Sequence, residues 1–66
     1  MHSPKSKIYF VVDITTTYRH YYEEEKDIFS PYEAYATLYT MFDAIKMRNK
    51  LLKGDKHKGL KLQVCK

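Results

Sequence analysis

The strongest constraint on the fold is a helix signal in the middle of the chain. Ser30, Pro31 and Glu33 supply a capping serine, a proline suited to the first helical position and a glutamate that closes a capping box. Side chains that would form one helical stripe then recur at spacings of three and four residues: Tyr35, Leu38, Phe42, Ile45, Asn49 and Leu52. Gly54 follows as a C-terminal stop. We therefore expect one long helix over residues 31–53.

Alternating segments on both sides of this helix predict strands. Residues 8–14 alternate between apolar and other side chains, and residues with high β-propensity continue through 15–22. A single strand of that length would be unusual, so we expect a hairpin that bends near residues 15–17. After the helix, residues 60–65 alternate again, which predicts a short third strand.

The order β-β-α-β predicts a two-layer α+β domain, in which the long helix covers one face of a three-stranded sheet. A right-handed crossover makes the last strand parallel to the second, with the first between them, so the sheet order is 2-1-3. The expected core takes one face of each element: Ile8, Phe10, Val12, Ile14, Tyr35, Leu38, Phe42, Ile45, Leu52, Leu60, Leu62 and Val64. Residues 1–66 form a single small domain, with a flexible tail at 1–6 and a basic loop at 54–59.

The short chain also limits which functions are possible. A chain of 66 residues buries only about 60% of the surface that it exposes when unfolded, which disfavours a deep enclosed active site. An isolated monomer of this size is marginally stable, which leaves homodimerisation or partner binding as ways to add stability. The single cysteine excludes an internal disulfide, and no segment approaches the roughly 20 apolar residues of a membrane span. We therefore expect a cytoplasmic protein that has no membrane partner.

Catalytic and metal-binding constellations are missing from the sequence. His2, His20 and His57 do not have the spacing of a local metal site, and no motif positions Cys65 beside a base. The glycines lie at the ends of a short basic loop that lacks the spacing and the following helix of a phosphate-binding loop. We therefore expect a protein that is not an enzyme and that binds neither a metal nor a cofactor.

One acidic residue forms an exception to this pattern. Asp13 comes at the end of the apolar run Ile8-Tyr9-Phe10-Val11-Val12, and this arrangement resembles the first strand of small ferredoxin-like nucleases. In those proteins an acidic residue near the end of the first strand lies close to the dimer axis, which would make Asp13 a metal-binding carboxylate. The resemblance covers residues 8–13, and the elements expected for this chain do not include the second helix and fourth strand of that fold. The alternative is a solvent-facing strand residue without a special role.

Tyrosine is unusually frequent, at seven of 66 residues, and three tyrosines lie beside an acidic run. Tyrosine and arginine are enriched in binding hot spots. We expect the three tyrosines to be exposed, because a short polar hairpin cannot turn all of them inward. The expected partner-binding segment comprises Tyr18, Arg19, Tyr21, Tyr22, Glu23, Glu24 and Glu25. The acidic run is either a solvated segment or a patch for a basic partner.

The leading interpretation is a non-enzymatic protein-binding module that acts as an inhibitor or adaptor of a larger protein. In size and composition the chain is similar to the accessory proteins of phages and mobile elements.

Charge is distributed unevenly along the chain. Residues 1–43 hold 4 basic and 7 acidic side chains, whereas residues 44–66 hold 8 basic and 1 acidic. Six lysines of the second part could follow the phosphates of a nucleic acid: Lys46, Lys50, Lys53, Lys56, Lys58 and Lys61. Such lysines also serve solubility and complement the helix dipole. The alternative function is thus sequence-independent, salt-sensitive nucleic-acid binding.

Overall fold

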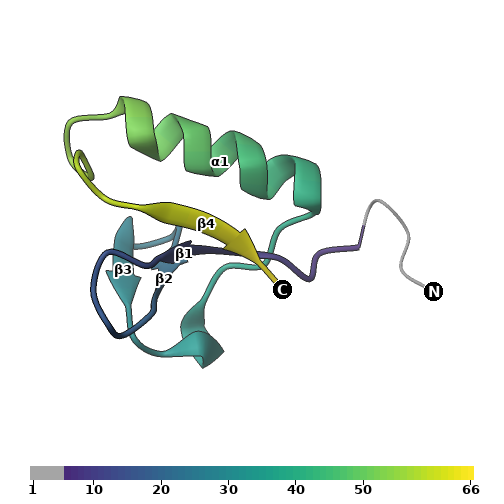
Figure 1. The fold of residues 1–66 in the computed structure, drawn as a ribbon. Helices are drawn as coiled ribbons and strands as arrows, with labels where there is room; N and C mark the ends of the chain where they lie inside the picture. The colour runs from purple at the N-terminus through teal and green to yellow at the C-terminus, as the bar shows by residue number, and fades with distance from the viewer. Residues whose placement is uncertain (1–5) are drawn as a thin grey trace.

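The computed structural model describes residues 6–66 and consists of a four-stranded antiparallel sheet with one α-helix packed on one of its faces (Figure 1). The predicted tail at 1–6 lies outside the described residues, apart from Ser6. The elements are strand β1 (Phe10–Asp13), strand β2 (His20–Glu23), strand β3 (Ile28–Ser30), the 3-10 helix η1 (Glu33–Tyr35), helix α1 (Met41–Lys53) and strand β4 (Leu62–Cys65). The α+β class is therefore confirmed.

The sheet has the order β3-β2-β1-β4, so the prediction of three strands in the order 2-1-3 is wrong. The predicted hairpin does form, since β1 pairs with β2 across a bend at residues 14–19. Val11 pairs with Val64, which places β4 on the other side of β1. The additional strand β3 pairs beside β2, with Phe29 opposite Tyr22. The turn between β2 and β3 needs a left-handed residue, and Asp27 (φ 53°) is of a type that tolerates this conformation.

Helix α1 begins at Met41, ten residues after the predicted start. Thr40 is its N-cap, and the Thr40 side chain accepts a hydrogen bond from the backbone N–H of Asp43 (3.1 Å). The segment before this cap is extended because Tyr9 and Tyr39 exchange two backbone hydrogen bonds, of 2.9 and 2.8 Å. A backbone paired in this way is not free to form the predicted helical turns. The predicted C-terminal end is correct, since the helix stops at Lys53.

The predicted capping serine has a different role. Ser30 is the last residue of β3, and its hydroxyl accepts a hydrogen bond from the backbone N–H of Tyr32 (3.1 Å). The chain then forms only the short helix η1 before it becomes extended again. Because a serine can satisfy either a helix start or a local turn, tertiary pairing of the surrounding residues decides between them.

The core lies between α1 and the face of the sheet that carries the odd-numbered residues of β1. Its buried cluster consists of Val11, Tyr22, Tyr39, Ala44 and Leu51. The prediction that the even-numbered face points toward the helix is therefore wrong. Val12 is nevertheless fully buried on the opposite face, so β1 is covered on both sides, as expected for the central strand.

The helix stripe predicted to cover the sheet remains at the surface. Phe42 is 69% exposed, Leu52 is 42% exposed and Ile45 is 37% exposed. The helix packs instead through Ala44, Met47 and Leu51, which repeat at the same spacing on another side of α1. Two apolar stripes with one period cannot be distinguished by periodicity, and small Ala44 allows the helix backbone to approach the sheet closely. No helix within residues 6–66 combines the length and apolar character needed to cross a membrane.

Candidate functional site

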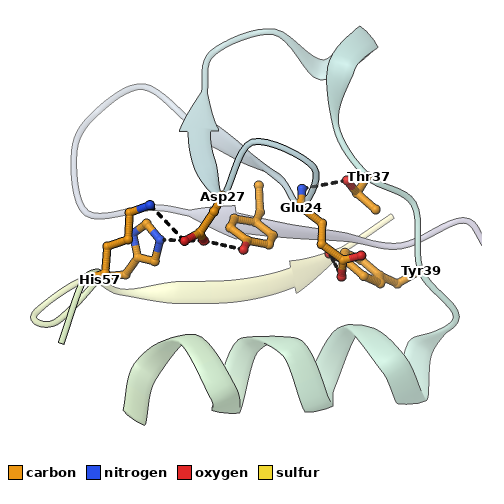
Figure 2. Close-up of polar contacts among 7 residues, drawn as sticks. Glu24, Asp27, Thr37, Tyr39 and His57 are labelled. Atoms are coloured by element: carbon orange, nitrogen blue, oxygen red, sulfur yellow. Dashed lines mark hydrogen bonds and ion pairs between the residues drawn. The ribbon is translucent and has the colours of Figure 1, made fainter. Parts of the chain in front are cut away.

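The turn between β2 and β3 lies close to α1 and is held at its Asp27 end by three hydrogen bonds (Figure 2). The Asp27 carboxylate accepts bonds from the Tyr22 hydroxyl (2.5 Å), the Lys56 ammonium (2.9 Å) and His57 Nε2 (3.2 Å). Lys56 and His57 belong to the loop after α1, so this contact joins segments about 30 residues apart in the chain. His57 also packs edge-on against the rings of Tyr22 and Phe29.

The charge state of this cluster follows from its hydrogen bonds. The bond from Tyr22, with those from Lys56 and His57, holds the pKa of Asp27 well below its usual range. Burial and the bond to Asp27 raise the pKa of Tyr22, so its hydroxyl stays a neutral donor. All three donors therefore converge on one carboxylate anion. Such an arrangement positions the loop and leaves Asp27 little capacity to act as a base.

A second group of contacts holds the other end of the same turn. The backbone N–H of Glu24 donates to the Thr37 hydroxyl (2.9 Å), and the Tyr39 hydroxyl donates to Glu24 Oε1 (3.2 Å), as Figure 2 shows. Burial, the negative charge of Glu24 and this hydrogen bond raise the pKa of Tyr39. The turn is therefore fixed at both ends against the segments that flank α1.

Two adjoining hollows follow the flank of α1 that faces this turn. Their volumes are about 520 and about 360 Å³, and both are lined by Glu24, Met47 and Lys50. Lys7 and Lys46 line the larger hollow, and Lys56 lines the smaller one. Together the hollows form a shallow trough with lysines along its rim.

The exposed surface of α1 is divided into two strips. An α-helix advances about 100° per residue, so side chains can be assigned to sectors around its axis. We call Met41, Phe42, Ile45 and Leu52 the α1 stripe; all four are exposed and fall within an arc of about 100°. Lys46, Lys50 and Lys53, which we call the lysine row, occupy the next sector, between the stripe and the trough.

Cations border the α1 stripe on both sides. On one side, the Lys46 ammonium lies 5.4 Å from the centre of the Phe42 ring, a cation–π contact. On the other side, Arg48 donates two hydrogen bonds to the side-chain oxygen of Asn49, of 3.3 and 3.1 Å. Asn49 itself lies within the arc of the stripe. The molecule thus presents an apolar strip with a basic rim.

The structure separates the tyrosines that were expected to act together. Tyr18 is 76% exposed, in the bend before β2. Tyr21 is half-buried and contacts the Phe10 ring edge-on, at 5.4 Å between centroids, on the face of the sheet opposite α1. Tyr22 is only 4% exposed and belongs to the core. The expectation that all three would be exposed is therefore wrong for Tyr22, because successive residues of a strand point to opposite faces.

The remaining residues of that predicted segment also diverge. Arg19 is exposed, Glu23 is buried in β2, and Glu24 and Glu25 are exposed in the turn. The surface that the segment offers is thus split between the bend around Tyr18 and the turn at the other end of β2. No local sequence signal could have shown this division, because it depends on which face of the sheet the helix covers.

All six lysines predicted to bind nucleic acid are exposed: Lys46, Lys50, Lys53, Lys56, Lys58 and Lys61. The structure brings three of them together, since Lys46, Lys50 and Lys56 line the trough. Lys56 is engaged by Asp27. Lys61 lies away from the trough: its backbone N–H donates to the Thr15 hydroxyl in the bend between β1 and β2 (2.9 Å).

The acidic residue at the end of β1 helps to shape the following bend. The Asp13 carboxylate accepts hydrogen bonds from the backbone N–H of Thr15 (2.9 Å) and from the Thr15 hydroxyl. No group of three or more histidine, cysteine, aspartate or glutamate side chains in the described residues could hold a metal ion.

Comparisons with known proteins gave no matching family model, no matching curated protein and no matching solved structure.

Proposed function

We propose that this chain is a non-enzymatic protein-binding module that acts as an inhibitor or adaptor of a larger protein, and that the α1 stripe is its binding surface. One observation carries the proposal: an apolar series with helical spacing stays exposed although the chain has folded. Phe42, at 69% exposed, is the most prominent anchor of the series. Large apolar side chains grouped on one surface mark interaction sites in small proteins.

The rigidity of α1 suits this role. Ala44, Met47 and Leu51 pack the opposite side of the helix into the core, so the stripe is held in place before a partner arrives. Binding then costs little ordering of the backbone, which leaves more of the contact energy as affinity. The expected mode is a helix face that enters an apolar groove of the partner, with anchors at helical spacing.

Photo-crosslinking tests which surface meets the partner. A benzophenone amino acid replaces Phe42 in one version of the full chain and Tyr18 in another, and each is irradiated in lysate of the source organism. We expect a discrete crosslinked protein from position 42 that disappears when Ile45→Asp is added. Tyr32→Gln, which changes an aromatic residue of similar exposure outside α1, serves as the matched control and should leave the crosslink intact.

The same experiment tests the surface that the sequence favoured. Tyr18 and Arg19 remain an exposed pair, and Glu24 and Glu25 are exposed at the other end of β2. Crosslinks from position 18 alone would transfer the binding site to the Tyr18 bend and contradict the assignment to α1. Crosslinks from position 42 that survive Ile45→Asp would show that the stripe does not carry the binding energy.

Nucleic-acid binding is the second candidate function, and the trough favours it. Lys7, Lys46 and Lys50 line one hollow, and Lys56 lines the hollow that adjoins it. Fluorescence anisotropy with a labelled oligothymidylate should then show binding that falls steeply with salt and is lost in the double variant K46E/K50E. No binding at about 50 mM salt would eliminate this candidate.

A further inference from the structure

We infer that the partner's groove has an acidic rim that meets the lysine row and Arg48. This inference rests on the proposed function and names the chemistry of the surface that the α1 stripe recognises. A partner protein of this kind supplies apolar side chains for Met41, Phe42, Ile45 and Leu52 and carboxylates at the edges of the groove.

The first support is the sign of the charge at both borders of the stripe. Lys46 contacts the Phe42 ring on one side, and Arg48 occupies the helix position that borders the stripe on the other, with its guanidinium bonded to Asn49 within the arc. Asp43 is the only acidic residue of α1 and lies beyond the lysine row, beside the trough. A partner with acidic edges gains attraction on both sides, whereas basic edges would be repelled.

The lysine row also disfavours a second copy of this chain as the occupant. If two copies paired their α1 helices antiparallel through the α1 stripe, a two-fold axis would relate the copies. The lysine row of one copy would then lie on the same side of the contact as the lysine row of the other. Lys46 and Lys53 of one copy would then face the same residues of the other. Like charges that face each other weaken such an interface.

Asn49 favours a protein over a lipid surface. Its amide lies within the arc of the stripe, between Ile45 and Leu52 along the helix. A protein groove can place a hydrogen-bonding group opposite an amide, as polar residues in helical seams show. Lipid chains have no such group, so burial of Asn49 in a bilayer surface would place its NH2 group, which is not the part bonded by Arg48, against hydrocarbon.

Selection of peptides tests the inference even while the partner is unidentified. The immobilised full chain is presented with a phage-displayed library of random peptides of about 16 residues, enough for about four helical turns. We expect the selected peptides to carry apolar residues at helical spacing with Asp or Glu beside them. Their affinity should fall about tenfold or more for the triple variant K46E/K50E/K53E, and should weaken with added salt.

A second triple variant controls for net charge. K58E/K61E/K66E changes the charge by the same amount at exposed lysines outside α1, so it should leave peptide affinity within about twofold of the wild type. Equal losses in the two triple variants would show that the lysine row has no special role and would overturn the inference.

The remaining outcomes separate this inference from the proposed function. Peptides that depend on Phe42 and Ile45 but are not acidic would overturn the acidic rim and leave the α1 stripe as the binding site. Peptides whose affinity for the chain is unaffected by Phe42→Gln and Ile45→Gln would count against both the inference and the proposed function. A library that yields no stripe-dependent peptide would do the same. Stripe-dependent binding to phosphatidylserine vesicles, or stripe-dependent self-association, would assign the surface to another occupant and overturn the inference.

Discussion

Three donors converge on Asp27, which makes this residue the main link between the β2–β3 turn and the loop after α1. Its left-handed backbone (φ 53°) allows the turn, and its carboxylate binds Tyr22, Lys56 and His57. The turn conformation and the loop contact thus depend on the same side chain.

Replacement of Asp27 by asparagine isolates the charge of this link, because asparagine also tolerates the left-handed conformation. The pKa of Asp27 in the folded protein is held below its ordinary value of 3.8. The ionised group therefore stabilises the fold fully above that value, and the stabilisation is lost as the pH falls toward the folded pKa. We expect a lower Tm for Asp27→Asn at about pH 7 and a smaller difference from the wild type below about pH 4.

Thermal unfolding followed by circular dichroism measures this difference. Both proteins share every other acidic group, so subtraction of the two Tm values at each pH removes the contribution of those groups. A Tm difference that stays constant from neutral to acidic pH would mean that the charge of Asp27 does not stabilise the fold.

Tyr18 and Tyr22 lie close in the sequence but differ in their exposure to solvent. Tyr18 is largely exposed, while Tyr22 fills the core and donates to Asp27. Substitution of Tyr22 by alanine therefore disrupts packing and is not a clean test of partner binding, whereas Tyr18 can be replaced without loss of core contacts.

Helix α1 carries two apolar stripes, and the fold uses only one of them. Ala44, Met47 and Leu51 pack on the sheet, whereas the α1 stripe stays exposed. The helix begins after its cap Thr40, which directly follows the backbone pairing of Tyr39 with Tyr9.

Removal of the N-cap tests the observed helix start. Thr40→Ala leaves the backbone N–H of Asp43 without its side-chain partner, so we expect the free energy of unfolding to fall by about 1 kcal/mol. Amide hydrogen exchange at Asp43 should accelerate in this variant. Ser30→Ala serves as the control, because that hydroxyl binds the N–H of Tyr32 and should not affect exchange within α1. Faster exchange in α1 after Ser30→Ala would contradict the observed start.

The whole molecule is held together by a small core. Among the described residues, the buried apolar side chains are Val11, Val12, Tyr22, Tyr39, Ala44 and Leu51. Several larger apolar side chains remain exposed, including the α1 stripe. Much of the apolar surface that could stabilise the chain thus stays exposed.

This distribution predicts modest stability and a monomeric state. We expect urea denaturation to give a cooperative transition with a free energy of unfolding of about 5 kcal/mol or less.

Light scattering after size exclusion should show a monomer, because the lysine row opposes antiparallel pairing of two α1 helices. Addition of the partner should raise the apparent stability by mass action. A stable dimer that dissociates on Phe42→Gln would contradict the prediction.

Local signals in the sequence were sufficient for several parts of this protein. The alternation in residues 8–14 and 60–65 predicted β1 and β4, the long run of β-type residues predicted the hairpin, and Gly54 marked the end of α1. The six lysines are exposed, as both interpretations of the basic segment require. Each of these features depends on neighbours in the chain, which is why a local pattern reveals it.

The parts that the sequence did not reveal all depend on contacts between distant segments. Pairing of Tyr9 with Tyr39 keeps the chain extended just before α1, where a helix was expected, and the contact of Asp27 with His57 joins two segments that no motif connects. The inward face of α1 was decided in the same way, because its two apolar stripes have equal periodicity and only packing on the sheet distinguishes them. Local chemistry thus determined the type of most elements, while long-range backbone pairing and packing determined where α1 begins and which of its faces stays exposed.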